Sequence, residues 1–265
     1  MTERRVPSRR TFLGQSLLGL GGLTASAEGQ SSPPGSPARP LSVVCVGAHP
    51  DDPETGCGGT LATYAERGHR TSIVYLTSGE RGIPGKSLDE AAAIRTKEAE
   101  EACRILGARP VFAGQIDGAT ELSGPRTAQF TALLEAEKPD VVFAQWPIDT
   151  HPDHQVASRL VLRAWLGAAR RFALYFFEVD TGHQSLGFAP TVYVDVGGQS
   201  ERKRSALLAH RSQHGDEIHR QHVQVMEAFR GREAGVAVAQ AFSSLAHRGL
   251  PEAALRRFDP GGPAA

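Results

Sequence analysis

Residues 41–68, LSVVCVGAHPDDPETGCGGTLATYAERG, change character twice along their length. A run of β-branched and small apolar residues gives way to an acidic loop with proline, and the loop gives way to a glycine-rich segment of helical composition. A continuous apolar run is typical of a strand that is buried on both faces. Aspartates before a helix are common N-caps. The stretch therefore predicts a strand, a tight turn and a helix, with a histidine and two adjacent aspartates in the turn.

The rest of the chain repeats this alternation of short apolar runs and longer helical patterns. We expect strands at 41–47, 70–78, 109–114, 140–146, 171–179 and 191–197. We expect helices at 58–68, 87–107 and 126–139, after Gln155, and at about 199–212 and 217–230. Strands that alternate with helices indicate right-handed βαβ units. The predicted fold class is therefore α/β, a doubly wound, mostly parallel sheet in a single domain with a C-terminal helical extension.

The first residues have the pattern of an export signal. SRRTFLG, at 8–14, resembles the twin-arginine signal, with Arg9 and Arg10 as the pair. The apolar run that follows is too short to span a bilayer comfortably, and the small residues Ala25-Ser26-Ala27 suit a cleavage site. We therefore expect a periplasmic or extracellular protein without stable membrane insertion after cleavage. A disordered basic tail and a retained N-terminal anchor are the alternatives.

Composition shifts divide the chain into four segments. The predicted order is a signal peptide at 1–27, a Pro/Ser/Gly-rich linker at 28–40, a folded domain at 41–231 and a C-terminal extension at 232–265. A linker of this composition has little apolar surface to bury.

Charge and cysteine content exclude several classes of protein. Lys+Arg and Asp+Glu are equal, at 29 each, so no excess positive charge would attract nucleic acid. The three cysteines, Cys45, Cys57 and Cys103, form no CxxC pair and cannot all pair with one another. We expect them to be small buried residues without a disulfide framework.

Two loops rich in histidine and aspartate follow predicted strands. AHPDDPE, at 48–54, follows the first strand, and WPIDTHPDH, at 146–154, follows the strand at 140–146. In open parallel sheets, sites form in the loops beyond the carboxyl ends of the strands. A single loop of this kind is usually a helix cap, but two of them at strand ends point to a shared site.

The residue types in these loops suit a catalytic metal ion. Zinc in such sites commonly has three ligands from His, Asp and Glu, and His49, Asp52 and His154 supply that set. A bound divalent ion lowers the pKa of its water ligand toward about 7. Asp51, next to a ligand, is then free to act as the general base on that water.

Hydrolysis of an acyl group also needs a group that stabilises the oxyanion. His151 lies one helical turn before His154, and a protonated His151 suits that role or the role of donor to a leaving amine. Asp153 is placed to hydrogen-bond and orient its ring. As helix caps, Asp51, Asp52 and Asp153 would instead be structural.

AHPDDPETGCGGTLA followed about a hundred residues later by HPDH resembles the PIG-L/LmbE-like family of zinc-dependent N-acetylglucosaminide deacetylases. Further matches are TSGERG at 77–82, IDG at 116–118 and KRSALLAHRSQ at 203–213. The resemblance runs from about residue 42 to 213 and implies a Rossmann-like fold.

The resemblance assigns a role to each matching residue. It makes His49, Asp52 and His154 the metal ligands, Asp51 the general base on zinc-bound water and His151 the group that polarises the carbonyl. It also implies that Arg95 and Asp117 contact the sugar. Pro53 separates Asp52 from Glu54, where the family often has an unbroken Asp-Asp-Glu, so the role of Glu54 stays open, as do those of His210 and His214.

The resemblance implies a zinc-dependent N-deacetylase whose substrate is a small molecule or oligosaccharide with an N-acetylated amino sugar. The signal pattern at the N-terminus adds the expectation that this enzyme is exported. Fe²⁺ or Co²⁺ would fit the same ligands, and similar proteins commonly form homo-oligomers. One alternative is a metal-dependent amidase that acts on another acyl amide. Another is a non-catalytic, metal-containing carbohydrate-binding protein, against which the presence of Asp51 and His151 argues.

Overall fold

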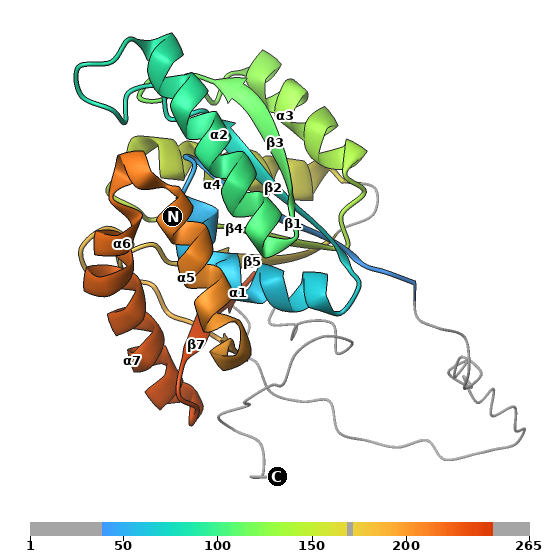
Figure 1. Cartoon of the computed structure of the whole chain (residues 1–265). Coiled ribbons are helices and arrows are strands. Elements are labelled where there is room, and N and C mark those ends of the chain that lie inside the picture. Colours follow the sequence, from blue (N-terminus) through green and yellow to red (C-terminus); the bar gives the residue numbers. More distant parts are fainter. Residues whose placement is uncertain (1–38, 169–171, 246–265) are drawn as a thin grey trace, which may run out of the picture. The chain divides into compact units, whose positions relative to one another are not determined.

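The computed structural model of this protein describes residues 39–168 and 172–245, which fold around a seven-stranded sheet (Figure 1). The strand order is β3-β2-β1-β4-β5-β7-β6. The strands are β1 (Ser42–Gly47), β2 (Arg70–Thr77), β3 (Arg109–Gln115), β4 (Val141–Gln145), β5 (Ala173–Phe177), β6 (Val192–Asp195) and β7 (Ala239–Ser244). The predicted signal peptide and most of the predicted linker lie outside the described residues.

The sheet is mostly parallel, as the sequence predicts. β1 pairs in parallel with β2 on one side and with β4 on the other, and β3 and β5 extend the parallel part. β7 lies between β5 and β6 and runs antiparallel to both. The predicted α/β fold class is therefore confirmed, with an antiparallel edge that the sequence does not predict.

Helices cover both faces of the sheet and bury a separate core on each. Val43 and Cys45 of β1 belong to one core, whereas Val44 and Val46 belong to the other, because successive side chains of a strand point to opposite faces. The helices are α1 (Asp52–Glu66), α2 (Leu88–Leu106), α3 (Gly124–Ala136), α4 (Pro152–Gly167), α5 (Ser200–Ala209), α6 (Gly215–Ile218) and α7 (Gln224–Ala234). Residues of α1, α2 and α5 contribute to the first core and residues of α3 and α4 to the second.

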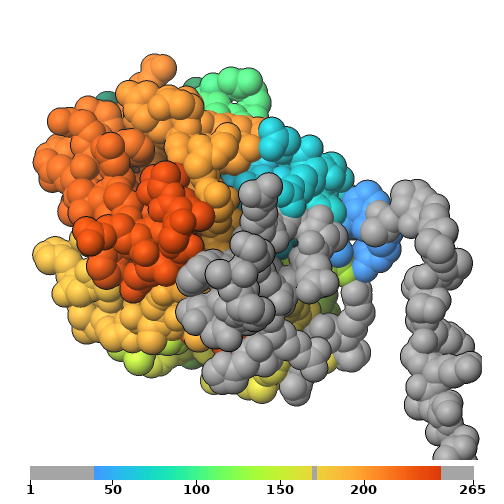
Figure 2. Space-filling view, turned by 90° about the horizontal axis from the view of Figure 1, so that it is seen from below, coloured from blue at the N-terminus to red at the C-terminus, as the bar shows by residue number. Residues whose placement is uncertain are grey.

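The glycines of GCGGT allow α1 to pack closely on its neighbours. A Cβ added at Gly56 would lie 2.1 Å from the ring of Phe177, and one at Gly59 would lie 2.8 Å from Val196. α5 also packs against α1, and Figure 2 shows its orange surface beside the cyan surface of α1. Gly56 and Gly59 therefore serve the close packing of α1 against the sheet.

Helix ends agree with the sequence in one case and differ in another. α2 is capped by Ser87 and ends before Gly107, in agreement with the predicted range of 87–107. The φ of Gly107, 76°, is the left-handed conformation of a C-terminal glycine cap. The predicted start of the first helix at 58 is wrong, because α1 already begins at Asp52. Asp51 precedes it as N-cap, and Pro53 lies in the first turn, where its missing N–H breaks no helical hydrogen bond.

The predicted domain boundary at residue 231 is also wrong. α7 continues to Ala234, and β7 follows within the same sheet. Phe242 of β7 is fully buried in the first core. Part of the predicted extension therefore belongs to the fold.

The three cysteines are buried free thiols, in agreement with the sequence analysis. Within the described ranges, no helix is both long enough and apolar enough to cross a bilayer.

Candidate active site

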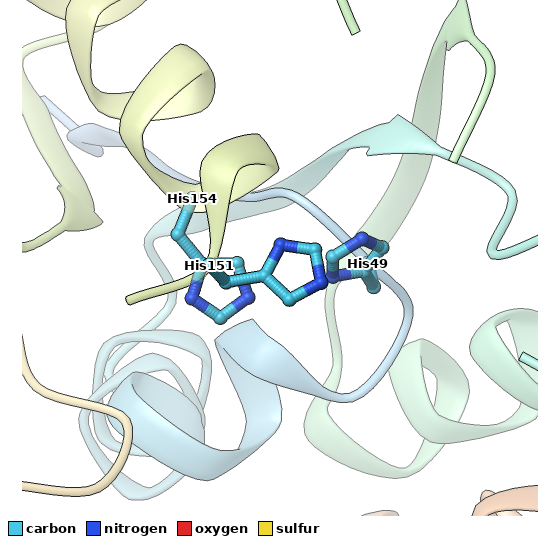
Figure 3. Close-up of side chains that lie close together, drawn as sticks. All are labelled: His49, His151 and His154. Carbon is cyan, nitrogen blue, oxygen red and sulfur yellow. The ribbon is translucent and has the colours of Figure 1, made fainter. Parts of the chain in front are cut away.

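The two histidine-rich loops meet at one edge of the sheet. β1 and β4 are parallel neighbours, so the loops that follow Gly47 and Gln145 leave the sheet at the same edge. Figure 3 shows the rings of His49, His151 and His154 gathered there, the first from the loop after β1 and the other two from the start of α4. The expected meeting of the two loops therefore occurs.

The carboxylate of Asp52 lies between two imidazole rings. Its Oδ2 is 3.3 Å from His49 Nδ1, and its Oδ1 is 3.4 Å from His154 Nε2. All three residues are buried. The structure thus brings together the three residues that the sequence suggests as metal ligands.

The other nitrogen of each ring faces a different carboxylate. His49 Nε2 lies 3.2 Å from Asp117 Oδ1 and 3.2 Å from Asp153 Oδ2, and His154 Nδ1 lies 3.2 Å from Asp149 Oδ1. Ligating histidines usually have such a second partner, which fixes the ring orientation and the tautomer. Here it leaves Nδ1 of His49 and Nε2 of His154 directed at Asp52.

The charges of the site suit a divalent cation. Burial by itself lowers the pKa of His49 and of His154, but the neighbouring carboxylates outweigh burial and raise the pKa of His154 to about 9 and that of His49 well above its usual value. Burial raises the pKa of Asp52, but the two histidines outweigh it and hold that pKa well below its usual value. The carboxylates therefore stabilise positive charge at this position, and a divalent ion on this His/Asp donor set would supply such charge.

In the described part of the chain, two groups of three residues have ligand atoms that all lie within 4.8 Å of one another. One group is His49, His151 and His154, and the other is His49, Asp117 and Asp153. The first shares two histidines with the predicted set. In the second, the Asp153 carboxylate also accepts hydrogen bonds from Gly118 N and Thr120 Oγ1. This pattern suits a carboxylate that orients His49.

Asp51 has a backbone conformation that is rare for a residue with a side chain, with φ 115° and ψ −33°. Such conformations cost about 1–3 kcal/mol and cluster at functional sites. Arg95 Nη2 lies 3.1 Å from Asp51 Oδ2 and donates to Pro50 O at 2.5 Å. Burial raises the pKa of Asp51 to about 6, although Arg95 opposes it, which is a suitable value for a general base near neutral pH.

His151 lies beside the other two histidines. Its ring stacks on that of His154 at a centroid distance of 4.6 Å and meets His49 edge-on at 4.7 Å. Burial, together with both neighbouring histidines, lowers the pKa of His151. Because its Nδ1 accepts a hydrogen bond from the backbone N–H of Asp153, the proton of the neutral ring is on Nε2.

Two sequence expectations for His151 need correction. Its lowered pKa favours a neutral ring, in place of the protonated one expected. The Asp153 carboxylate orients His49 rather than His151, because Asp153 lies in the first turn of α4 with its side chain toward Gly118 and Thr120. Only its backbone N–H reaches the His151 ring.

Arg95 and Asp117 also lie at the site, but their contacts are with the protein. Arg95 is only 3% exposed, and its guanidinium lies so close to Gly79 and Gly82 that a Cβ at either would come within 2.3 Å of Nη1. Asp117 accepts a hydrogen bond from Arg81 N and faces His49. The predicted sugar contact of these residues remains a prediction.

A cavity of about 420 Å³ opens above these residues. Arg81, Gln184 and Gln213 line the cavity as well. The sequence analysis did not single out these three residues, and it also missed Asp149, the partner of His154. Gln213 belongs to the KRSALLAHRSQ match, and Asp149 lies two residues before His151, so weak signals for both were present. His214 is exposed and contributes no side chain to this cavity.

Comparison with known proteins places this architecture among deacetylases. The family model of PIG-L, GlcNAc-PI de-N-acetylase, matches residues 44–165. The chain is 40% identical to the uncharacterized deacetylase YaiS of Escherichia coli K12, over 64% of the chain and 90% of that protein. It is 29% identical to the diacetylchitobiose deacetylase of Thermococcus kodakarensis, over 66% of the chain and 71% of that protein. The structure of the N,N'-diacetylchitobiose deacetylase from Pyrococcus horikoshii matches with a TM-score of 0.69 at 27% identity, and covers 77% of this chain and 84% of that one.

Proposed function

This chain belongs to the PIG-L family of GlcNAc-type deacetylases, and from that premise we propose that it is a metal-dependent hydrolase. It removes the N-acetyl group from an N-acetylglucosamine-type amino sugar or a conjugate of one. The observation that carries the proposal is the placement of Asp51 and His151 on one cavity with His49, Asp52 and His154.

His49, Asp52 and His154 would hold the ion, and zinc is the first choice for such a donor set. A bound divalent ion lowers the pKa of a water ligand and polarises an acyl carbonyl. Asp149, Asp117 and Asp153 hold the two histidine rings in the orientation that directs one nitrogen of each toward Asp52.

Asp51 carries out both proton transfers, and His151 stabilises the charge that develops on the acyl oxygen. Asp51 takes the proton of the attacking water as its oxygen adds to the acyl carbonyl carbon. The Nε2–H of His151 donates a hydrogen bond to the oxygen that becomes negative. The C–N bond then breaks as the amine nitrogen takes the proton from Asp51, which leaves acetate and a free amino sugar.

The N-terminal twin-arginine pattern supports export as part of the proposal. We expect a cell that expresses the full chain to deliver it outside the cytoplasm, and a variant with Arg9→Lys and Arg10→Lys to retain it. Equal delivery of both would remove the twin-arginine assignment. Homo-oligomer formation, which the resemblance implies, also stays a prediction.

Acetate release by the purified, zinc-supplied protein tests the reaction. The panel contains N-acetylglucosamine, short chito-oligosaccharides, N-acetylglucosaminyl conjugates and acyl amides without a sugar. Release from an amino-sugar substrate supports the proposal. Release only from the simple acyl amides would favour the amidase alternative, and release from none would remove deacetylation from first place.

A further inference from the structure

The strained backbone of Asp51 is held by a residue outside the proposed reaction. The Asp51 carbonyl oxygen accepts the ordinary helical hydrogen bond from Thr55 N at 2.9 Å. The Asp51 N–H, which no helical carbonyl can reach, donates to Glu54 Oε2 at 3.2 Å. A conformation of this kind persists only where its surroundings fix it, so Glu54 is part of what fixes it.

Glu54 is itself fixed through its other oxygen. It lies in the first turn of α1 and is completely buried. Its Oε1 accepts the hydroxyl of Tyr75 at 2.5 Å and lies 3.1 Å from His210 Nε2. Because both oxygens are engaged, the carboxylate cannot rotate away from Asp51 without breaking these contacts.

His210 reaches Glu54 because the chain turns sharply at the end of α5. The ring is completely buried. The His210 backbone N–H donates to Leu207 O at 3.0 Å, and its carbonyl accepts Gly215 N at 3.2 Å. A Cβ at Gly215 would lie 1.9 Å from Leu207 O, so the turn requires glycine. Among the described residues, neither ring nitrogen of His210 has a hydrogen-bond partner, so its contact with Glu54 is the 3.1 Å approach of Nε2 to Oε1 as a charge pair.

We infer that Glu54, which contacts with Tyr75 and His210 hold in place, is a positioning residue for the reaction. It holds the backbone N–H of Asp51 and thereby fixes where the carboxylate of the base lies. Since Glu54 is completely buried, it does not touch substrate. The inference rests on the proposed role of Asp51 and gives a role to two residues, Glu54 and His210, that the sequence left open.

Glu54→Ala and Glu54→Gln test the inference in the full-length, zinc-loaded protein. Alanine removes the acceptor for Asp51 N–H, whereas glutamine keeps a carbonyl oxygen in the same place. Glu137→Ala is the matched control, because Glu137 also has a hydroxyl partner, Ser72, and a cationic one, Arg109. Those partners lie at the starts of β2 and β3, at the other end of the sheet.

For Glu54→Ala we expect kcat at least tenfold lower, KM within twofold of wild type and an unchanged zinc content per chain. Glu54→Gln should recover kcat to within threefold, and Glu137→Ala should leave kcat unchanged. An unchanged kcat in Glu54→Ala, or equal losses in the alanine and glutamine variants, would overturn the inference. A loss of zinc in proportion to activity would also overturn it, because Glu54 would then act on the metal site.

If Glu54→Ala does not fold, Tyr75→Phe takes its place. It removes the hydroxyl that donates to Glu54 and keeps the ring, and we expect a kcat at least threefold lower at unchanged KM. An unchanged kcat would overturn the inference.

Crystal structures separate this inference from the proposed function. If the wild type releases no acetate, the function proposal fails. The positioning role of Glu54 is then decided by φ of Asp51 in Glu54→Ala, or in Tyr75→Phe where that variant replaces it. A φ that leaves the positive region supports it, and a retained φ of about 115° overturns it.

Discussion

The buried guanidinium of Arg95 and the partly exposed carboxylate of Asp51 form an ion pair, with Nη2 3.1 Å from Oδ2. The same nitrogen donates to Pro50 O, so Arg95 ties α2 to the loop that carries the proposed base. The resemblance implies that Arg95 contacts the sugar. In this structure its observed contacts are with the catalytic loop, and the two roles predict different kinetics.

Arg95→Met keeps an unbranched side chain, although a shorter one, and removes its charge. Because Asp51 loses the partner that holds it, we expect kcat to fall at least tenfold while KM changes less than threefold, in steady-state assays of acetate release. Arg95→Lys, which retains the charge but not the forked geometry, should be intermediate. A rise in KM with unchanged kcat would show that Arg95 serves the sugar instead.

Asp149→Asn should weaken zinc binding without unfolding the protein. Asp149 accepts from the backbone N–H of His151 and faces His154 Nδ1, and loss of such a partner typically reduces metal affinity 10–100-fold. Competition with a chelator measures the change. Asp140→Asn is the control, because Asp140 binds Arg39 and Ser42 N at the opposite end of β1, and equal affinities in both variants would contradict the assigned role.

The metal-free protein should become less stable as the pH rises above 6.5. Burial lowers the pKa of His154, but Asp52 and Asp149 raise it to about 9. A pKa raised on folding stabilises the protein fully below the unfolded pKa, about 6.5, and that contribution is lost as the pH rises through 9. We expect urea denaturation to show a loss of about 2 kcal/mol over this range. The slope should be smaller in His154→Gln, and identical slopes would refute the expectation.

Gly56→Ala should destabilise the fold. The added Cβ would lie 2.1 Å from the buried ring of Phe177, and overpacking of this kind costs about 1–3 kcal/mol. Better helix propensity recovers about 1 kcal/mol of that loss. Gly124→Ala, in α3, has open space around the new Cβ and should be neutral or slightly stabilising. Equal free energies of unfolding for both variants would count against the close packing of α1.

The parallel part of the fold could be predicted because its strands are buried on both faces and therefore read as continuous apolar runs. β7 could not, because AQAFSS mixes polar and small residues. Gln240 is nevertheless buried, since its side chain accepts hydrogen bonds from Thr60 of α1. Such a partner, 180 residues away in the chain, leaves no local pattern.

The members of the site were predictable, and their partners were less so. The spacing within each loop points to His49, Asp52 and His154, because local geometry decides which side chains can meet. The target of the Asp153 carboxylate depends on a third loop that carries Thr120. The burial of His210 depends on the turn after α5. Contacts between distant loops are set by the packed fold, so sequence spacing alone could not assign them.

The most direct test of the account compares wild type with Asp51→Asn, both loaded with zinc, on the amino-sugar substrate that the panel identifies. Asparagine keeps the shape of the side chain and cannot take the proton, so we expect acetate release to fall by about 10²–10⁴-fold. Zinc content and thermal stability should stay close to wild type. Acetate release at an undiminished rate by a zinc-loaded Asp51→Asn would contradict the assignment of Asp51 as the base.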